Sequence, residues 1–358
     1  MTGSTSTKVL TSSSRILTGP NPFGVPERFD LLQPVQPDVP HYSETMYFPV
    51  CDRRHEGLGL FLHMGRVSDD LELWWARTIA YLPGGRVVMA RTFGRAPDDR
   101  GPATGNLAVR CEQEHRRWRL SFDGAGELTT REATGQGLSG EGAAVPLRFD
   151  VELTSISPVW DLEAACGISD PDPNLTSWAS RHQQQAFLAD GTITAAGQRW
   201  ELDAVAYRDH SWGPRDVSGF GGDAFATVIF PESRRVACGM VIYGMDGQPN
   251  LRTFYISEGD QLELIEEGEV PWATDTLSNP RTGLEFSLRR HTGELVVLRG
   301  EVLNGATTTV LEPNRNLNGA ALGRADALVL NEDIVRYTWP DGEVGYGHSE
   351  RGIRPTAR

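Results

Sequence analysis

Side chains able to perform acid–base chemistry are concentrated in ten consecutive residues near the middle of the chain. Residues 207–216 read Tyr-Arg-Asp-His-Ser-Trp-Gly-Pro-Arg-Asp, which brings together two carboxylates, two guanidinium groups, an imidazole, a hydroxyl and an indole. A carboxyl group and an imidazole can both exchange protons with a substrate near neutral pH. The segment is therefore a candidate acid–base site, with Asp209 and His210 as the expected catalytic groups.

An alternating pattern indicates that this segment is the end of a β-strand. The polar and apolar residues of 199–205 alternate before it, and Gly213-Pro214 stops it, because proline lacks an N–H and fixes its own φ. Successive side chains of a strand point to opposite faces. Asp209 and His210 then lie on opposite faces, and both reach one cavity only if a bulge or turn redirects one of them. One face should carry Trp200, Leu202, Ala204, Ala206, Arg208, His210 and Trp212, and the other Asp203, Val205, Tyr207, Asp209 and Ser211.

A purely structural role explains the same residues, and the pattern leaves both interpretations open. His210 can be a buried histidine bonded to the backbone, and Trp212 a core tryptophan beside the turn. The charged residues of the segment can form a surface ion-pair cluster at the strand end, namely Arg208, Asp209, Arg215 and Asp216.

Polar residues from other segments are candidates for the same cavity. His182 and Gln184 share one face if their segment is a strand, and His63 ends another apolar run. The face of an indole can stabilise a developing positive charge, which is the role expected for Trp212. The residues expected to contact a substrate are Tyr207, Arg208, Trp212, Arg215, Asp216, His63, His182 and Gln184.

Composition excludes several classes of function. The chain has 358 residues, 39% of them hydrophobic, and a formal net charge of −14. A charge of this sign disfavours binding to nucleic acid or to anionic membranes. The sequence contains neither a run long and apolar enough to span a membrane nor a secretory signal, so we expect a cytoplasmic protein.

Metal and redox cofactors are not expected either. The four cysteines are far apart in sequence, as is usual for buried thiols in a reducing compartment. The histidines show no H-x-H or H-E-x-x-H spacing. Residues 135–140 match G-x-G-x-x-G, but neither a preceding apolar strand nor a following helix accompanies them, so we expect a flexible loop rather than a dinucleotide site.

Short strands separated by turns account for most of the chain. Residues 147–153 alternate strictly, and Gly84-Gly85 joins two apolar runs as in a hairpin. Runs of this kind recur every 8–12 residues in both halves, whereas helical patterns are few. This rhythm is typical of sandwiches and barrels, and it predicts an all-β protein that contains a duplicated barrel.

Several motifs together resemble a known superfamily. They are His182-x-Gln184, Gly191-x-Ile193, Gly197-x-x-Trp200, the segment 208–216 and, in the first half, Tyr42-x-Glu44-x-x-Tyr47. In these motifs the chain resembles the carotenoid 1,2-hydratase (hydroxyneurosporene synthase) and AttH-like superfamily, over roughly residues 40–310. It is most similar to a branch with an Asp-His-Ser-Trp-Gly-x-Arg signature. Carotenoid hydratases usually carry Arg-Ser-Trp-Gly, so His210 before Ser211 is a departure from the hydratase pattern.

The resemblance implies two lipocalin-like antiparallel β-barrels packed together around a cavity for an apolar molecule. Relatives include hydratases, tocopherol cyclases and pericyclases that use no redox cofactor. The expected organisation is a flexible tail (1–26), an N-terminal lipocalin-like domain (27–180) and a C-terminal lipocalin-like domain (181–350) that carries the motif.

Two functions follow as expectations. The first is a cofactor-independent hydratase/lyase, isomerase or cyclase that acts on an apolar terpenoid, steroid-like or aromatic compound in a β-barrel cavity near the domain interface. The second is a non-catalytic carrier of a hydrophobic ligand, because lipocalin-like barrels also hold ligands without transforming them. A domain that works only with a partner enzyme is a third, weaker option. A homodimer is kept open as the form of assembly.

Overall fold

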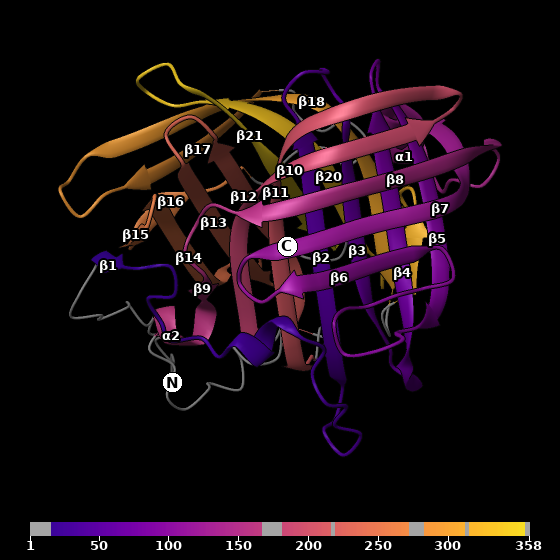
Figure 1. The fold of residues 1–358 in the computed structure, drawn as a ribbon, viewed down its shortest axis with the longest axis horizontal. Coiled ribbons are helices and arrows are strands. Elements are labelled where there is room, and N and C mark those ends of the chain that lie inside the picture. Colours follow the sequence, from indigo (N-terminus) through magenta and orange to yellow (C-terminus); the bar gives the residue numbers. More distant parts are fainter. Residues whose placement is uncertain (1–15, 167–180, 216–218, 272–282, 312–314, 355–358) are drawn as a thin grey trace.

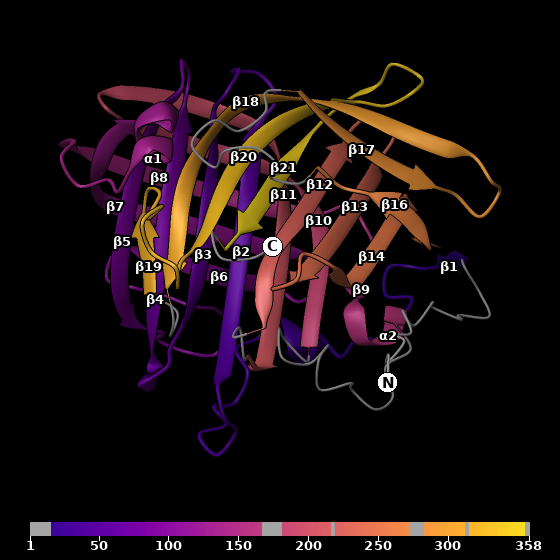
Figure 2. The same cartoon turned by 180° about the vertical axis from the view of Figure 1, so that it is seen from behind.

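The strands form two large antiparallel sheets that lie against each other (Figure 1 and Figure 2). The computed structural model describes residues 16–166, 181–215, 219–271, 283–311 and 315–354. The first sheet contains β2 (Tyr42–Asp52), β3 (Gly59–Val67), β4 (Asp70–Leu82), β5 (Arg86–Arg95), β6 (Leu107–Gln113), β7 (Arg117–Thr130), β8 (Ala143–Ser155), β9 (Trp160–Asp161), β10 (Arg181–Ala195) and β11 (Gln198–Pro214).

The second sheet is built mainly from the C-terminal half of the chain, in orange to yellow in Figure 1. Its hydrogen-bonded order is β1-β15-β14-β13-β12-β21-β20-β18-β17-β16, with β19 paired to β18. Its strands are β1 (Ile16–Thr18), β12 (Phe220–Phe230), β13 (Arg235–Gly244), β14 (Pro249–Glu258), β15 (Gln261–Ile265), β16 (Glu267–Glu269), β17 (Gly283–Arg289), β18 (Leu295–Leu311), β19 (Arg315–Asn318), β20 (Leu328–Thr338) and β21 (Val344–Ile353). The described helices are short: η1 (Glu27–Asp30), α1 (Arg131–Gln136) and α2 (Leu162–Cys166). The all-β prediction is confirmed.

The first sheet closes on itself as an eight-stranded barrel. Its order is β11-β2-β3-β4-β5-β7-β8-β10, and β10 pairs with β11 along its full length, from Arg181 opposite Trp212 to Ala195 opposite Gln198. Closure leaves no unpaired edge among these strands. Apart from β1, the strands up to β11 form the first sheet and the strands from β12 onward form the second. The domain boundary between residues 180 and 181 stays a prediction of the sequence.

Large side chains fill the interior of the barrel. Trp118, Phe48 and Phe187 lie in one buried cluster with the inward residues of the other barrel strands, and the rings of Phe48 and Trp118 are 5.5 Å apart. Leu31 and Leu32, beside η1, pack against the same cluster. The barrel is therefore a packed core held together by apolar burial.

A second buried cluster joins the outer face of the barrel to the second sheet. Phe61 and Ile79 of the barrel belong to it together with Phe225, Ile229 and Leu330 of the second sheet. The two sheets thus share an apolar interface, and any cavity within it is walled by both.

Several sequence expectations can be compared directly with these elements. The hairpin at Gly84-Gly85 is confirmed as the β4–β5 connection, and the alternating segment 147–153 lies within β8. Part of the expected tail is ordered, because β1 pairs with β15, whereas residues 1–15 lie outside the described residues. The expected loop at 135–140 begins inside α1, which ends at Gln136.

Among the described residues, no helix is long and apolar enough to cross a membrane. The cytoplasmic location and the homodimer stay predictions of the sequence.

Candidate functional site

A cavity lies between the outer face of the barrel and the second sheet. Its volume is about 100 Å³. It lies outside the packed barrel, near the interface of the two halves where the sequence analysis expected a cavity. The barrel contributes Thr45, Tyr47, His63, Trp75, His182, Asp209, Ser211 and Arg215 to its wall. The second sheet and its C-terminal extension contribute Asp223, Phe225, Met240, Ile242, Val310, Asn316, Leu328, Leu330, Glu350 and Arg354.

Strand β11 delivers the central residues of the motif to this cavity by simple alternation. Asp209 and Ser211 line the cavity, and Tyr207, on the same face, belongs to the interface cluster. Ala204 and Ala206, from the opposite face, belong to the barrel core. The predicted division of the strand into two faces is confirmed.

Asp209 is held by two residues of the neighbouring strand β10. His182 Nε2 and Asp209 Oδ2 share a hydrogen bond, and Gln184 Nε2 donates to the same oxygen at 3.0 Å. The Tyr207 hydroxyl donates a hydrogen bond to Gln184 Oε1 at 2.8 Å, so both the oxygen and the nitrogen of the Gln184 amide are held. Only 6% of Asp209 is exposed. The carboxyl group is therefore oriented and desolvated, as a proton-transfer group requires.

Arg215 brings a positive charge to the same wall. Its Nη2 donates to Ser211 Oγ at 2.7 Å and to Thr45 Oγ1 at 3.1 Å. Burial lowers the pKa of Arg215 to about 10, although Asp209 and Glu350 partly offset this by raising it. The guanidinium group therefore stays protonated near neutral pH.

The aromatic residues of the wall carry buried polar atoms without partners. Tyr47 Oη, His63 Nδ1 and Trp75 Nε1 are buried and have no hydrogen-bond partner within the described part of the chain. Burial, together with the charges of Arg77 and Arg215, lowers the pKa of His63 well below its usual value, so this imidazole is neutral. Because buried polar groups are almost always paired, these atoms indicate a place for a ligand or water.

The opposite wall carries carboxyl groups on the second sheet. Asp223 and Glu350 line the cavity, and Glu332 faces Glu350 directly across the β20–β21 pairing. Burial is the main cause that raises the pKa of Glu350 and of Glu332 to about 8, and Glu332 adds to the effect on Glu350. Burial and the neighbouring Glu350 raise the pKa of Asp223 well above its usual value. These groups are therefore mostly neutral acids near pH 7 and can donate protons.

The raised pKa values predict a pH-dependent stability. Glu332 and Glu350 have pKa values of about 8 in the folded protein and an ordinary value of 4.5. As pH rises between these values, the unfolded chain releases protons that the folded protein keeps, so the free energy of unfolding falls. We expect the pair to account for a loss of about 2–4 kcal/mol between about pH 5 and pH 8.

Urea unfolding of the wild type and of Glu332→Gln across this range measures the effect. The amide of Glu332→Gln stays neutral at every pH. The free energy of unfolding of this variant, relative to that of wild type, should therefore be lowest at low pH and should increase as pH rises. A constant difference between the two proteins would contradict the assigned pKa direction.

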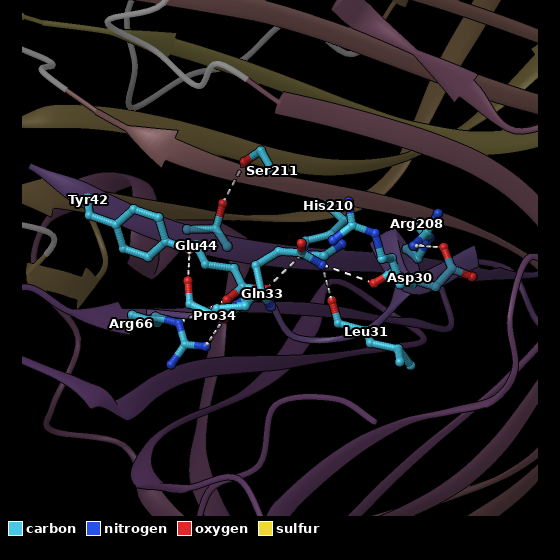
Figure 3. Close-up of polar contacts among 12 residues, drawn as sticks. Asp30, Leu31, Gln33, Pro34, Tyr42, Glu44, Arg66, Arg208, His210 and Ser211 are labelled. Carbon is cyan, nitrogen blue, oxygen red and sulfur yellow. Dashed lines mark hydrogen bonds and ion pairs between the residues drawn. The ribbon is translucent and has the colours of Figure 1, made fainter. Parts of the chain in front are cut away.

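Three residues of the motif, Arg208, His210 and Trp212, alternate with Asp209 and Ser211 and do not line the cavity. Figure 3 shows Arg208 beside Asp30, and His210 near Glu44. His210 Nε2 lies 3.0 Å from Glu44 Oε1, and Arg208 Nη1 lies 2.6 Å from Asp30 Oδ1. The ring of Trp212 lies 4.7 Å from that of His210. The structure therefore does not bring Arg208, His210 and Trp212 together with Asp209, because β11 has no bulge here to redirect them.

A buried polar network explains why these residues are present. Glu44 accepts hydrogen bonds from Gln33 N at 2.9 Å and from Arg66 Nε at 2.8 Å, in addition to its contact with His210. Figure 3 shows how this network connects the segment after η1 to strands β2, β3 and β11. Its role is to fix the N-terminal segment over the end of the barrel.

The other candidates of the sequence analysis have mixed outcomes. His63, His182 and Arg215 line the cavity, whereas Gln184 and Tyr207 support Asp209 from behind. Asp216 lies outside the described residues.

Sequence reasoning missed the carboxyl groups of the second sheet. Asp223 is the lone acid in β12, whose eleven residues are all buried. Glu332 lies in β20 between Asn331 and Asp333, where residues 328–335 are all buried. An acid within an otherwise apolar strand is costly to bury, and that cost is the signal that could have identified these residues.

Within the described part of the chain, no group of three or more His, Cys, Asp or Glu side chains is arranged to hold a metal ion.

Comparison with known proteins supports the fold. A family model described as "Domain of unknown function (DUF7064)" matches residues 27–353, whereas no curated protein matches the sequence. A Nitrosomonas europaea protein provisionally described as an AttH is 13% identical, with a TM-score of 0.57 over 90% of this chain and 95% of that one.

Two further solved structures share the fold. CghA with Sch210972 is 10% identical, with a TM-score of 0.52 over 95% of this chain and 98% of that one. Kievitone hydratase from Nectria haematococca is 10% identical, with a TM-score of 0.51 over 97% of each chain. The expected AttH-like fold is thus confirmed, whereas the specific carotenoid 1,2-hydratase activity stays a prediction.

Proposed function

This chain belongs to the DUF7064 family, and we propose that it is a cofactor-independent acid–base enzyme acting on an apolar small molecule between the barrel and the second sheet. The reaction class we propose is a hydration or its reverse, an isomerisation or a cyclisation. The substrate is proposed to be a terpenoid, steroid-like or aromatic compound. One protein with this fold is named a hydratase, which supports the first of these reactions.

One observation carries the proposal: proton-transfer groups line both walls of one apolar cavity. Asp209 and His182 share a hydrogen bond on the barrel wall, whereas Asp223 and Glu350 lie on the opposite wall. Burial raises the pKa of Glu350 to about 8. Carboxyl groups on opposite walls of one cavity can serve as the acid and the base of one reaction.

The residues then divide the proton transfers between them. The neutral acid pair protonates the substrate, and the Asp209–His182 pair removes a proton from water or from a carbon next to the developing positive charge. The proton leaves by the Asp209–His182 hydrogen bond, and His182 Nδ1, which has no partner among the described residues, can pass it onward. Phe225, Met240 and Leu330 exclude bulk water from the reacting atoms.

The carrier hypothesis makes a different prediction, so one experiment separates the two. The protein is incubated in D₂O with a panel of oxygenated terpenoids, steroids and polycyclic aromatics, and the recovered compounds are analysed by mass spectrometry. An acid–base enzyme adds or removes one heavy water, or introduces deuterium into an isomerised or cyclised product. Recovery of every bound compound unchanged and without deuterium would favour the carrier.

A further inference from the structure

The second-sheet wall of the cavity has a polar feature that proton transfer from Asp209 and His182 does not require. Glu350 faces Phe225 across the β12–β21 pairing, and Asp223 lies two residues before Phe225 on the same face. A Cβ placed at Gly352, opposite Asp223, would come within 2.1 Å of Asp223 Oδ1. The glycine thus leaves the space that the Asp223 carboxyl occupies.

Asp223 still has hydrogen-bonding capacity to spare. Only 4% of the residue is exposed, and its Oδ1 has no partner among the described residues. Asp223 is hydrogen-bonded to Glu350, and Glu350 to Glu332, so three neutral carboxyl groups hold three O–H donors and the two hydrogen bonds between them use only two. One donor therefore remains for a group inside the cavity.

The barrel wall offers independent donors to the same cavity. Tyr47, 9% exposed, and Trp75, 6% exposed, both line it, and their Oη and Nε1 atoms have no partner within the described residues. An indole N–H can only donate. Burial and the charge of Asp209 raise the pKa of Tyr47 well above its usual value, so its phenol also keeps its proton. Residues of both walls thus carry O–H or N–H groups that need an acceptor.

A hydrocarbon would leave these donors desolvated and unpaired, which disfavours it as the ligand. An anionic ligand would approach the Asp209 carboxyl group, and the Arg215 cation on the same wall already donates to Thr45 and Ser211. A neutral ligand with an acceptor oxygen satisfies the donors and adds no charge to the apolar cavity.

We propose that Asp223 and Glu350 form a binding site for an acceptor oxygen of the ligand, such as a ketone or enone carbonyl. The ligand class is therefore a neutral, oxygenated ring compound rather than a hydrocarbon. This proposal rests on the proposed function for the choice of cavity, but it concerns binding and can be tested without turnover.

Three matched probes test the proposal by isothermal titration calorimetry: tetralin, 1-tetralone and 1-aminotetralin, which differ in one substituent. At about pH 6 we expect the protein to bind the ketone at least about tenfold more tightly than the hydrocarbon. At about pH 9 this preference should shrink, because the carboxyl pair loses a proton. The ionisable groups that act on or are influenced by Glu350 are Tyr47, Arg77, Asp209, Arg215, Asp223 and Glu332.

Two double variants assign the effect to the pair. Asp223→Asn with Glu350→Gln keeps neutral donors, so the ketone preference should persist at both pH values. Asp223→Leu with Glu350→Leu removes the donors, and its preference should fall to within about threefold. Thermal unfolding verifies that each variant is folded. Glu285→Gln, which removes an exposed carboxyl from β17, is the matched charge control and should behave as wild type.

Several results would overturn the proposal. They are equal binding of tetralin and 1-tetralone by the wild type, full preference in the leucine variant, tightest binding of 1-aminotetralin, or no binding of any probe at millimolar concentration. None of these binding results decides whether the Asp209 variant discussed below loses turnover. The two proposals can therefore fail separately.

Discussion

Asp209→Asn lowers the rate of any reaction that the wild-type protein catalyses by about 10²–10⁴-fold. Asparagine has nearly the same shape, and its side-chain oxygen can still accept the hydrogen bond that Gln184 donates at 3.0 Å. It cannot exchange a proton with His182, with which Asp209 shares a hydrogen bond. The chemical step should therefore be lost while the binding of the compound changes little. The measurements are single-turnover rates and ligand affinity.

Asp203→Asn is the matched control, because Asp203 lies on the same face of the same strand. It pairs with Arg53 and Arg54 near the surface and does not line the cavity. We expect its rate to stay within about twofold of wild type, as for a surface ion pair. His210→Gln should mainly lower stability, since His210 contacts Glu44 inside the barrel. A rate within tenfold of wild type for Asp209→Asn would show that another group transfers the proton.

The division of β11 into two faces was predictable from sequence, but the choice between them was not. Alternation correctly grouped Tyr207 with Asp209 and Arg208 with His210. Both faces end in polar groups, so periodicity gives no reason to prefer one. The difference comes from distant residues: Glu44 precedes His210 by 166 positions, and that separation carries no local signal.

The strands themselves were largely predictable, whereas their assignment to sheets was not. Turn residues and alternation mark individual strands because these are local properties. The closure of β10 and β11 onto β2 and β8 depends on long-range pairing. The same limitation applies to the interior of the barrel, because sequence patterns do not show that Trp118 and Phe48 fill it.

The second large effect concerns the ion pair inside the barrel. Asp30→Asn should lower the free energy of unfolding by about 3–5 kcal/mol, because it leaves a buried guanidinium group without its carboxylate. Arg208 and Asp30 are both fully buried, and their closest atoms, Nη1 and Oδ1, are 2.6 Å apart. Asp30 also accepts a hydrogen bond from the backbone N of His115 at 2.5 Å. Urea unfolding monitored by tryptophan fluorescence measures the loss.

A double variant distinguishes the loss of an ion pair from general damage to η1. Asp30→Asn leaves the charge of Arg208 without a partner, and Arg208→Met removes that charge. Methionine can also pack against Trp118, whose ring lies 5.4 Å from the guanidinium carbon. The double variant should therefore be more stable than Asp30→Asn alone, with a favourable coupling of about 1–3 kcal/mol. If the two losses simply add, the pair does not hold the N-terminal segment to the barrel. Because Arg208 lies on the face of β11 opposite Asp209, neither change should alter the affinity of the cavity for 1-tetralone by more than about threefold.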